Sequence, residues 1–423
     1  MKKVLLTLFA VLMAVPAFAI EVYNNDNGTT VDLYGSIRGY IGYGWAEKSA
    51  TNAGVTTTTT TGDNMLFGLQ KNSRVGVKFK VGQFSGNVEL GANEQTLNNS
   101  GGASSANTIG LRHIWGAYDF GVGGKLLVGK TSTPTEMGGW SSDVFDIDGA
   151  LNGFGGNRTG DRCFQVQWSL AGFQIALVQD DTQTINTLTS SFDGGFGNSY
   201  IPRISAAYNY NYKSDDYSLK AKIGATYTAV NGALSDPTVV NDNSRWDTVH
   251  AFKIVAGVRP TFLGGKMWVS IQGAYGQNED LFRGAKAGYS TGGYESKGLT
   301  LTDLGITADR NSYNTEHGGL MGEIGYNITN VFGVVVGGGY QRSNFIGKDQ
   351  YKATNGMNVG LDSYAVYFQV PITVNKYLSF HPQVTWYETS IAGGNKTFGG
   401  TNHYITEEKR TAVVAGMQMR VTF

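Results

Sequence analysis

Apolar and polar residues alternate along most of this chain with a period of two. From Val31 to Trp45 the odd positions are apolar, aromatic or glycine, whereas the even positions include Asp32 and Arg38. Successive side chains of a strand point to opposite faces, so the segment predicts a strand with one apolar and one polar face. The same alternation recurs in five further segments: 74–81, 203–213, 217–227, 252–259 and 413–423.

The predicted strands are long, and the segments that join them differ in length. The strands run to roughly twelve to sixteen residues, against about five or six in globular proteins, and a tilted strand crosses a bilayer in about 9–11. Seven short joints fall near 82–83, 121–124, 171–172, 214–215, 263–264, 328–330 and 374–375. Eight long polar segments alternate with them, near 46–64, 94–108, 132–161, 180–200, 231–246, 279–315, 345–357 and 392–407.

Seven short turns and eight long loops join sixteen strands. Each unpaired backbone group in hydrocarbon costs several kcal/mol, so a membrane-spanning sheet has to close on itself. The sequence therefore predicts an all-β protein, a transmembrane antiparallel β-barrel of about 16 strands. Its apolar face meets lipid, its polar face encloses water, the short turns are periplasmic and the long loops are external.

Composition narrows the remaining classes of function. The single cysteine excludes a disulfide framework and a zinc site built on cysteine pairs. Basic and acidic residues balance at 33 each, which leaves no basic surplus for binding nucleic acid. No segment after the first twenty residues has the ~20 apolar residues of a membrane helix, so a helical membrane protein is excluded.

The first nineteen residues predict a secretory signal peptide. Lys2 and Lys3 precede an apolar run from Val4 to Val15, and Ala17-Phe18-Ala19 has the small residues of a cleavage site. Residues 1–19 are thus expected to be removed on export, and residues 20–423 to form the barrel.

Several short segments resemble the general porins of Gram-negative outer membranes. They are Val31 to Gly35, Ser73 to Lys78, Arg112 to Tyr118, Arg162 to Gln179 and the C-terminal Phe423 with its alternating apolar residues. The resemblance implies a homotrimer in a lipopolysaccharide-containing outer membrane, a third loop (131–162) folded into the lumen, and recognition of Phe423 by the insertion machinery. It further implies passive diffusion of small hydrophilic solutes and ions, with no cofactor, no metal and no enzymatic activity.

The resemblance also implies a constriction with opposed charges. Arg74 and Arg112 match wall arginines, Arg162 matches more loosely, and Arg38 shares the polar face of the first strand. The loop acids that would face them are Glu136, Asp143, Asp146 and Asp148. Opposed charges across a narrow throat create a transverse field, and charged rings set ion preference.

Other interpretations remain open at this stage. The same barrel could be a channel selective for anions, phosphate or sugars, or a non-conducting structural or adhesive protein. The threonine run 56–61 reads as an exposed, mobile loop segment with no packing role. Aromatic residues near strand ends predict interfacial girdles rather than a sugar slide: Tyr43, Trp45, Trp115, Tyr326, Tyr340 and Trp386.

Overall fold

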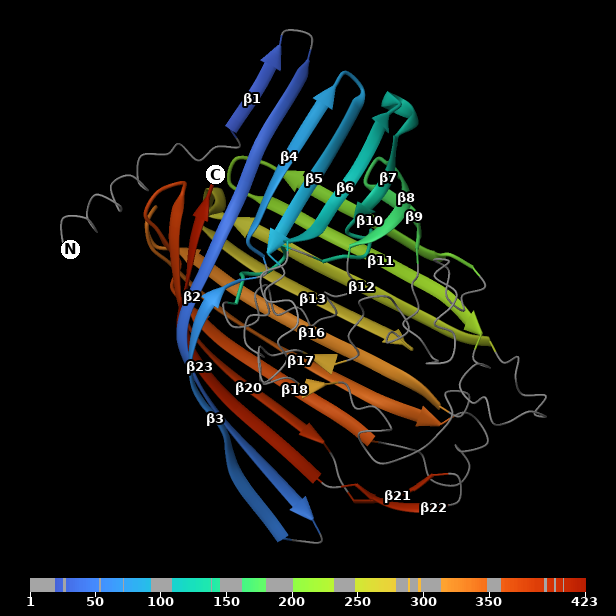
Figure 1. Ribbon diagram of the computed structural model, residues 1–423, viewed down its shortest axis with the longest axis vertical. Helices are drawn as coiled ribbons and strands as arrows, with labels where there is room; N and C mark the ends of the chain where they lie inside the picture. Colours follow the sequence, from blue (N-terminus) through green and yellow to red (C-terminus); the bar gives the residue numbers. More distant parts are fainter. Residues whose placement is uncertain are drawn as a thin grey trace, which may run out of the picture.

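The protein is a single closed barrel of antiparallel strands (Figure 1). The computed structural model describes residues 20–25, 28–52, 55–70, 72–92, 109–137, 139–144, 162–179, 201–231, 248–278, 288–289, 296–297, 313–347, 359–391, 394–398, 401–405 and 407–423. No helix in these segments is long and apolar enough to cross a membrane.

Nineteen strands form the main sheet. The first nine are β1 (Ile20–Asn25), β2 (Thr29–Asn52), β3 (Val55–Leu69), β4 (Arg74–Val81), β5 (Phe84–Ala92), β6 (Ile109–Asp119), β7 (Lys125–Thr131), β8 (Cys163–Leu170) and β9 (Phe173–Val178). They are followed by β10 (Arg203–Lys213), β11 (Ser218–Asn231), β12 (Thr248–Phe262), β13 (Met267–Gln277), β16 (Tyr313–Asn327), β17 (Gly333–Gly347), β18 (Val359–Gln369), β19 (Ile372–Thr373), β20 (Leu378–Ile391) and β23 (Glu407–Thr422). Two small hairpins, β14 (Gly288–Tyr289) with β15 (Ser296–Lys297) and β21 (Gly394–Phe398) with β22 (Thr401–Ile405), complete the set.

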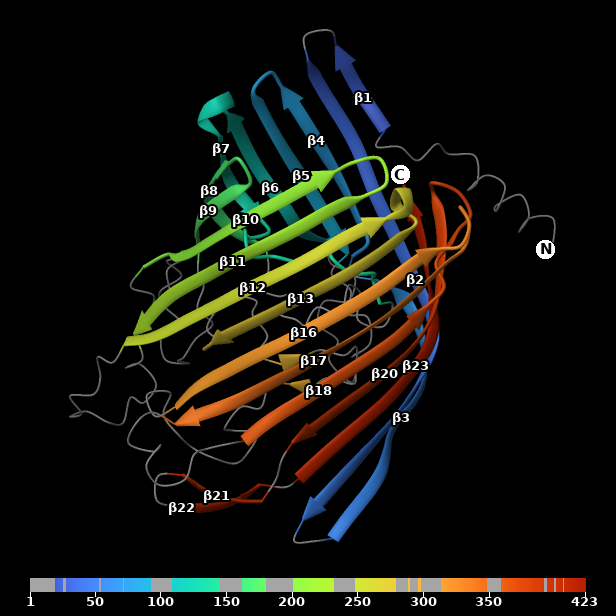
Figure 2. The ribbon, with the colours of Figure 1, turned by 180° about the vertical axis from the view of Figure 1, so that it is seen from behind.

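The barrel closes where the first long strand meets the last. β2 pairs with β23 from Ser36↔Thr422 to Thr51↔Glu407, and Gly35 and Phe423 exchange backbone hydrogen bonds of 2.8 and 3.0 Å. β3 and β4 lie end to end beside β2, β18 and β19 lie end to end beside β20, and β1 pairs only with the start of β2. Counted as wall positions these make the predicted sixteen strands, and Figure 2 shows β10 to β20 in order along one wall.

The predicted alternation separates the two faces of the wall. On β2, Ser36 and Arg38 are buried on the inner face, whereas Ile37 and Tyr43 are exposed on the outer face. The cross-strand register carries the inner face around the barrel and back to β2, where Arg38 lies opposite Arg420 of β23. Large apolar side chains consequently form the outer surface on every wall, which is what a lipid environment requires.

Aromatic residues border this apolar surface at two levels. Near the short turns, Tyr217 packs against Tyr212 and Phe262, while ten residues further along β11 the ring of Tyr227 stacks on His250. That spacing matches the about 9–11 residues in which a tilted strand crosses a bilayer. Trp115 is a correction to the predicted girdle: its partner Asn87 is on the inner face, so Trp115 points into the lumen.

The short turns lie at all seven predicted places. At the β8–β9 turn Ala171 and Gly172 have φ values of 50° and 88°, and at the β4–β5 turn Gly82 has φ of 56°. A two-residue hairpin turn with positive φ at both residues has a backbone twist that matches the right-handed twist of the two strands it joins.

The predicted loop over 46–64 is wrong. β2 continues to Asn52 and β3 begins at Val55, so the threonine run belongs to a strand that pairs with β2. Thr58 and Thr56 share hydrogen bonds of 2.9 Å with Ser49 and Thr51. Threonine is β-branched and favours strands, a local preference that outweighs the low complexity of the run.

Candidate lumen constriction

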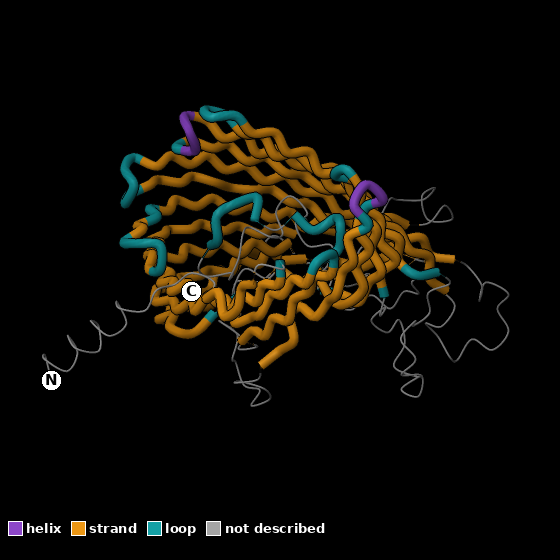
Figure 3. The backbone as a smooth tube through the Cα atoms, turned by 90° about the horizontal axis from the view of Figure 1, so that it is seen from above, coloured by secondary structure: helices purple, strands orange, loops and turns teal. Residues whose placement is uncertain are grey.

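The segment after β7 lies along the inner face of the barrel. Figure 3 shows loop segments, in teal, inside the ring of strands. The hydrogen bonds of the segment after β7 follow the strand order: Thr135 to Ser205 on β10, the Glu136 carbonyl to Lys222 on β11, and the Gly139 carbonyl to Arg259 on β12. The Trp140 carbonyl then accepts from Ser270 on β13, the Ser142 amide donates to Glu323 on β16, and the Asp143 carbonyl accepts from Gln369 on β18. The segment thus crosses about half of the wall and narrows the lumen.

Asp143 fixes the far end of this segment to the closure of the barrel. Its carboxylate accepts from Arg38 of β2 at 2.7 Å and from Arg420 of β23. Burial opposes ionisation of this carboxyl, but the two guanidinium charges outweigh burial and hold the pKa of Asp143 below its ordinary value. One charged residue therefore joins the loop to the first and last strands of the barrel.

Glu323 of β16 is a second attachment point, one residue before Asp143 along the loop. This buried carboxylate accepts hydrogen bonds from the Ser142 amide at 2.6 Å, from the Trp268 indole at 2.7 Å and from the Tyr367 hydroxyl. Three donors satisfy a carboxylate that burial would otherwise destabilise.

The wall that this segment does not cross carries a separate cluster around Glu89 of β5. Arg112 donates to Glu89 at 2.7 Å, and Arg74 lies 3.4 Å from the same carboxylate. The Tyr34 hydroxyl also donates to it, at 2.9 Å. Arg112 reaches the carboxylate because the β5–β6 register shifts between Glu89 and Leu90.

Arg162 joins the same cluster through His113. Its Nε donates to His113 Nε2 at 2.9 Å, and His113 Nδ1 lies 3.0 Å from the hydroxyl of Thr131. A ring nitrogen that accepts from a guanidinium carries no proton, so this geometry belongs to the neutral imidazole. The positive charge of Arg162 is thus added to those of Arg74 and Arg112 beside one carboxylate.

The eight residues expected at the throat therefore fall into four groups. Arg74, Arg112 and Arg162 come together on the β4–β8 wall, whereas Arg38 pairs with Asp143 beneath the loop. Glu136 contributes its carbonyl to the attachment on β11. Asp146 and Asp148 lie outside the described residues, as do the predicted signal peptide and most of the long loops.

Sequence reasoning missed several members of the site. The sequence pattern could have identified Arg420, since this residue lies on the polar side of the alternation over 413–423. Glu89 and Glu323 had no such signal, because only the register around the barrel shows which arginine or loop amide each one meets.

Comparison of this chain with known proteins identifies its fold. No family profile matches the sequence, and no curated protein matches it either. Among solved structures, the outer membrane channel DcaP of Acinetobacter baumannii aligns with a TM-score of 0.55 and 17% identity over 96% of this chain and 100% of its own. The fold is that of an outer-membrane porin.

Two further outer-membrane protein structures align over similar lengths with lower scores. The trimer form of OmpT from Vibrio cholerae has a TM-score of 0.48 and 12% identity over 93% of this chain and 99% of its own. The anion-selective porin from Comamonas acidovorans has a TM-score of 0.47 and 14% identity over 93% of this chain and 100% of its own. The barrel fold and its apolar outer surface place the chain in the bacterial outer membrane.

Proposed function

We propose that this protein is a porin whose water-filled lumen lets small hydrophilic solutes and ions diffuse passively across the outer membrane. One observation carries the proposal. Residues 135–137 and 139–144 are hydrogen-bonded along strands β10 to β18 and paired with the β2–β23 closure, which leaves the lumen beside the β4–β8 wall for solutes.

In this proposal the described cations have two different roles. Arg74, Arg112 and Arg162 line the passage, while Arg38 and Arg420 hold the loop in place through Asp143. Asp146 and Asp148 follow that anchor in sequence and are proposed as the acids on the loop side of the throat. The homotrimer and recognition of Phe423 by the insertion machinery stay predictions from the porin resemblance.

Single-channel recording of the purified mature protein in a planar bilayer tests this function. Stepwise, ohmic openings in groups of three are expected for an open trimeric channel. A protein that inserts into the bilayer without conducting would contradict the diffusion function and favour a structural or adhesive barrel. Conductance in single rather than triple steps would contradict the trimer alone.

A further inference from the structure

Cations follow one side of the lumen from the throat to the short-turn mouth. On β4, Arg74, Lys78 and Lys80 all point inward, since Arg74 pairs with buried Ser36 and the other two follow at even spacing. Six residues of strand span about 20 Å. Lys125 of β7 lies on the same inner face, at the turn end of the neighbouring hairpin.

Most of this positive charge is not neutralised by the described residues. The Lys78 ammonium lies 4.7 Å from the centroid of the Tyr34 ring, and the Lys125 ammonium lies 5.7 Å from that of Trp115. An aromatic ring attracts a cation but does not cancel its charge. At the throat, the carboxylate of Glu89 forms ion pairs with both Arg74 and Arg112, so one negative charge faces two positive charges.

Two carboxylates lie near the lysines. Asp32 is across the ladder from Lys78, and Asp119 is across from Lys125. Asp119 is engaged by the turn, where its Oδ1 accepts from the Gly121 amide at 2.8 Å. Neither acid comes within ion-pair distance of a lysine in the described part of the chain.

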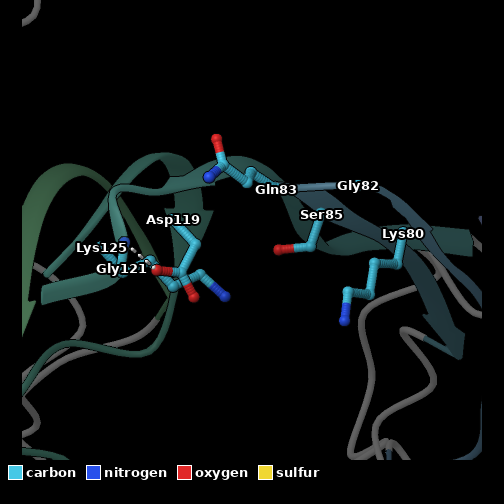
Figure 4. A pocket seen from close by; sticks show the side chains of 7 residues that line it. All are labelled: Lys80, Gly82, Gln83, Ser85, Asp119, Gly121 and Lys125. Carbon is cyan, nitrogen blue, oxygen red and sulfur yellow. Dashed lines mark hydrogen bonds between the residues drawn. The ribbon is translucent and has the colours of Figure 1, made fainter. Parts of the chain in front are cut away.

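The cations end at a cavity of about 480 Å³ at the short-turn mouth. Lys80, Ser85, Gln83 and Lys125 line it together with Asp119 and the turn glycines. In Figure 4 the Lys80 ammonium and the Ser85 hydroxyl extend to the same side, while the Asp119 carboxylate turns to Gly121. The volume is within the range of about 300–1,000 Å³ typical of small-molecule sites.

We propose that this wall is an anion track: small oxyanions with two negative charges pass the Arg74–Arg112–Arg162 cluster, follow Lys78, and are held briefly at the cavity between Lys80 and Lys125. The inference rests on the channel function and adds its substrate class, small dicarboxylates or phosphate. Ammonium and hydroxyl donors around a small cavity suit both anions.

The electrostatics favour accumulation without tight binding. The lysines are exposed or half-buried in a wet vestibule, where each ion pair is weak and screened by salt. Across ~6 Å of water one added positive charge corresponds to about a threefold preference for an anion. Several weak sites in series raise the local anion concentration and still release the solute.

The reversal potential in a potassium chloride gradient is the first test. We expect a chloride over potassium permeability ratio above one, which the triple variant Arg74→Ser, Lys78→Ser, Lys80→Ser lowers at least threefold. A native channel that prefers potassium would overturn the track. A protein that never conducts would instead overturn the channel function, so the two failures are distinguishable.

Block of the chloride current by succinate or phosphate, added on the short-turn side, tests the cavity. Lys80→Ala with Lys125→Ala should raise the half-blocking concentration at least tenfold, since each of the two lost charges acts on an anion with two negative charges. The control Lys213→Ala removes an exposed inward lysine of β10, away from the cavity, and should leave the block unchanged. Equal effects of both variants would overturn the cavity site, and block by only one of the two anions would identify the substrate class.

Discussion

At the scale of single residues, Asp143 is the charge on which the position of the loop depends. It pairs with Arg38 and Arg420, which come from the two strands that close the barrel. Removing one member of a buried ion pair leaves the others uncompensated and costs about 3–5 kcal/mol, and less here because the Asp143 side chain is 25% exposed.

The variant Asp143→Asn should release this end of the loop. We expect larger and noisier single-channel currents than in the native protein, because the loop no longer keeps one position. The control Asp119→Asn changes an exposed acid of the β6–β7 turn and should leave the noise unchanged. Currents of native size and noise from Asp143→Asn would show that the other attachments hold the loop alone.

The depressed pKa of Asp143 sets the direction of a pH dependence. Stabilisation by this carboxylate is complete at pH values above its pKa in the unfolded chain, about 4. The stabilisation is lost as the pH falls through the lower pKa of the folded protein. Current noise should therefore stay constant from pH 7 to about 4 and rise only in stronger acid. Noise that already rises near pH 6 would assign the loop anchor to another group.

Glu89 is the negative charge among Arg74, Arg112 and Arg162, which we propose to line the throat. Glu89→Gln keeps the shape of the side chain and leaves Arg74 and Arg112 without the carboxylate they share. The chloride over potassium permeability ratio should rise about threefold from the loss of this one charge. A ratio that stays the same would place the cluster away from the ion path.

At the scale of elements, the short turns depend on the backbone conformations that their residues permit. Ala171 has φ of 50°, a region that costs a residue with a Cβ about 1–2 kcal/mol. Gly172 has φ of 88°, and a Cβ there would meet the Asn209 carbonyl.

Opposite effects on stability are expected from two substitutions in this turn. Ala171→Gly should preserve or raise stability by up to about 1 kcal/mol, whereas Gly172→Ala should lower it by about 1–2 kcal/mol. Urea unfolding of the barrel in detergent or vesicles measures both. Equal effects would mean that the turn has another conformation.

The loop also needs space on the wall where it lies. A Cβ at Gly257 would meet the end of the fully buried Met137 side chain. Gly257→Val should push the loop from the wall toward the lumen and lower the single-channel conductance, while Gly322→Ala, whose nearest contact is 3.9 Å, should have native conductance. A native conductance for Gly257→Val would mean that Met137 moves without the loop.

At the scale of the whole molecule, the apolar outer surface decides where the barrel is stable. Ile223 is 58% exposed midway between the two aromatic levels of β11, so Ile223→Lys should cost about 2–4 kcal/mol in a bilayer. Asn211→Lys, on the inner face of the adjacent β10, should be tolerated. Unfolding in lipid vesicles measures the difference, and equal losses would contradict the assignment of faces.

The period-two pattern determined the fold, because it gives each strand one apolar face for lipid and one polar face for water. Only a closed sheet satisfies the backbone hydrogen bonds of such strands in lipid. The same alternation placed Arg38, Arg74 and the turns 82–83 and 171–172 correctly. It did not determine the loop over 46–64, because low complexity says nothing about pairing with β2.

Only the tertiary structure decided which charges meet. Asp143 is 105 residues from Arg38 and 277 from Arg420, and no local pattern relates positions so far apart. The register of sixteen strands and the path of one loop bring them together, and the same register gathers Glu89 with its arginines. Alternation fixes the face of a side chain, whereas its partners depend on the closure of the whole barrel.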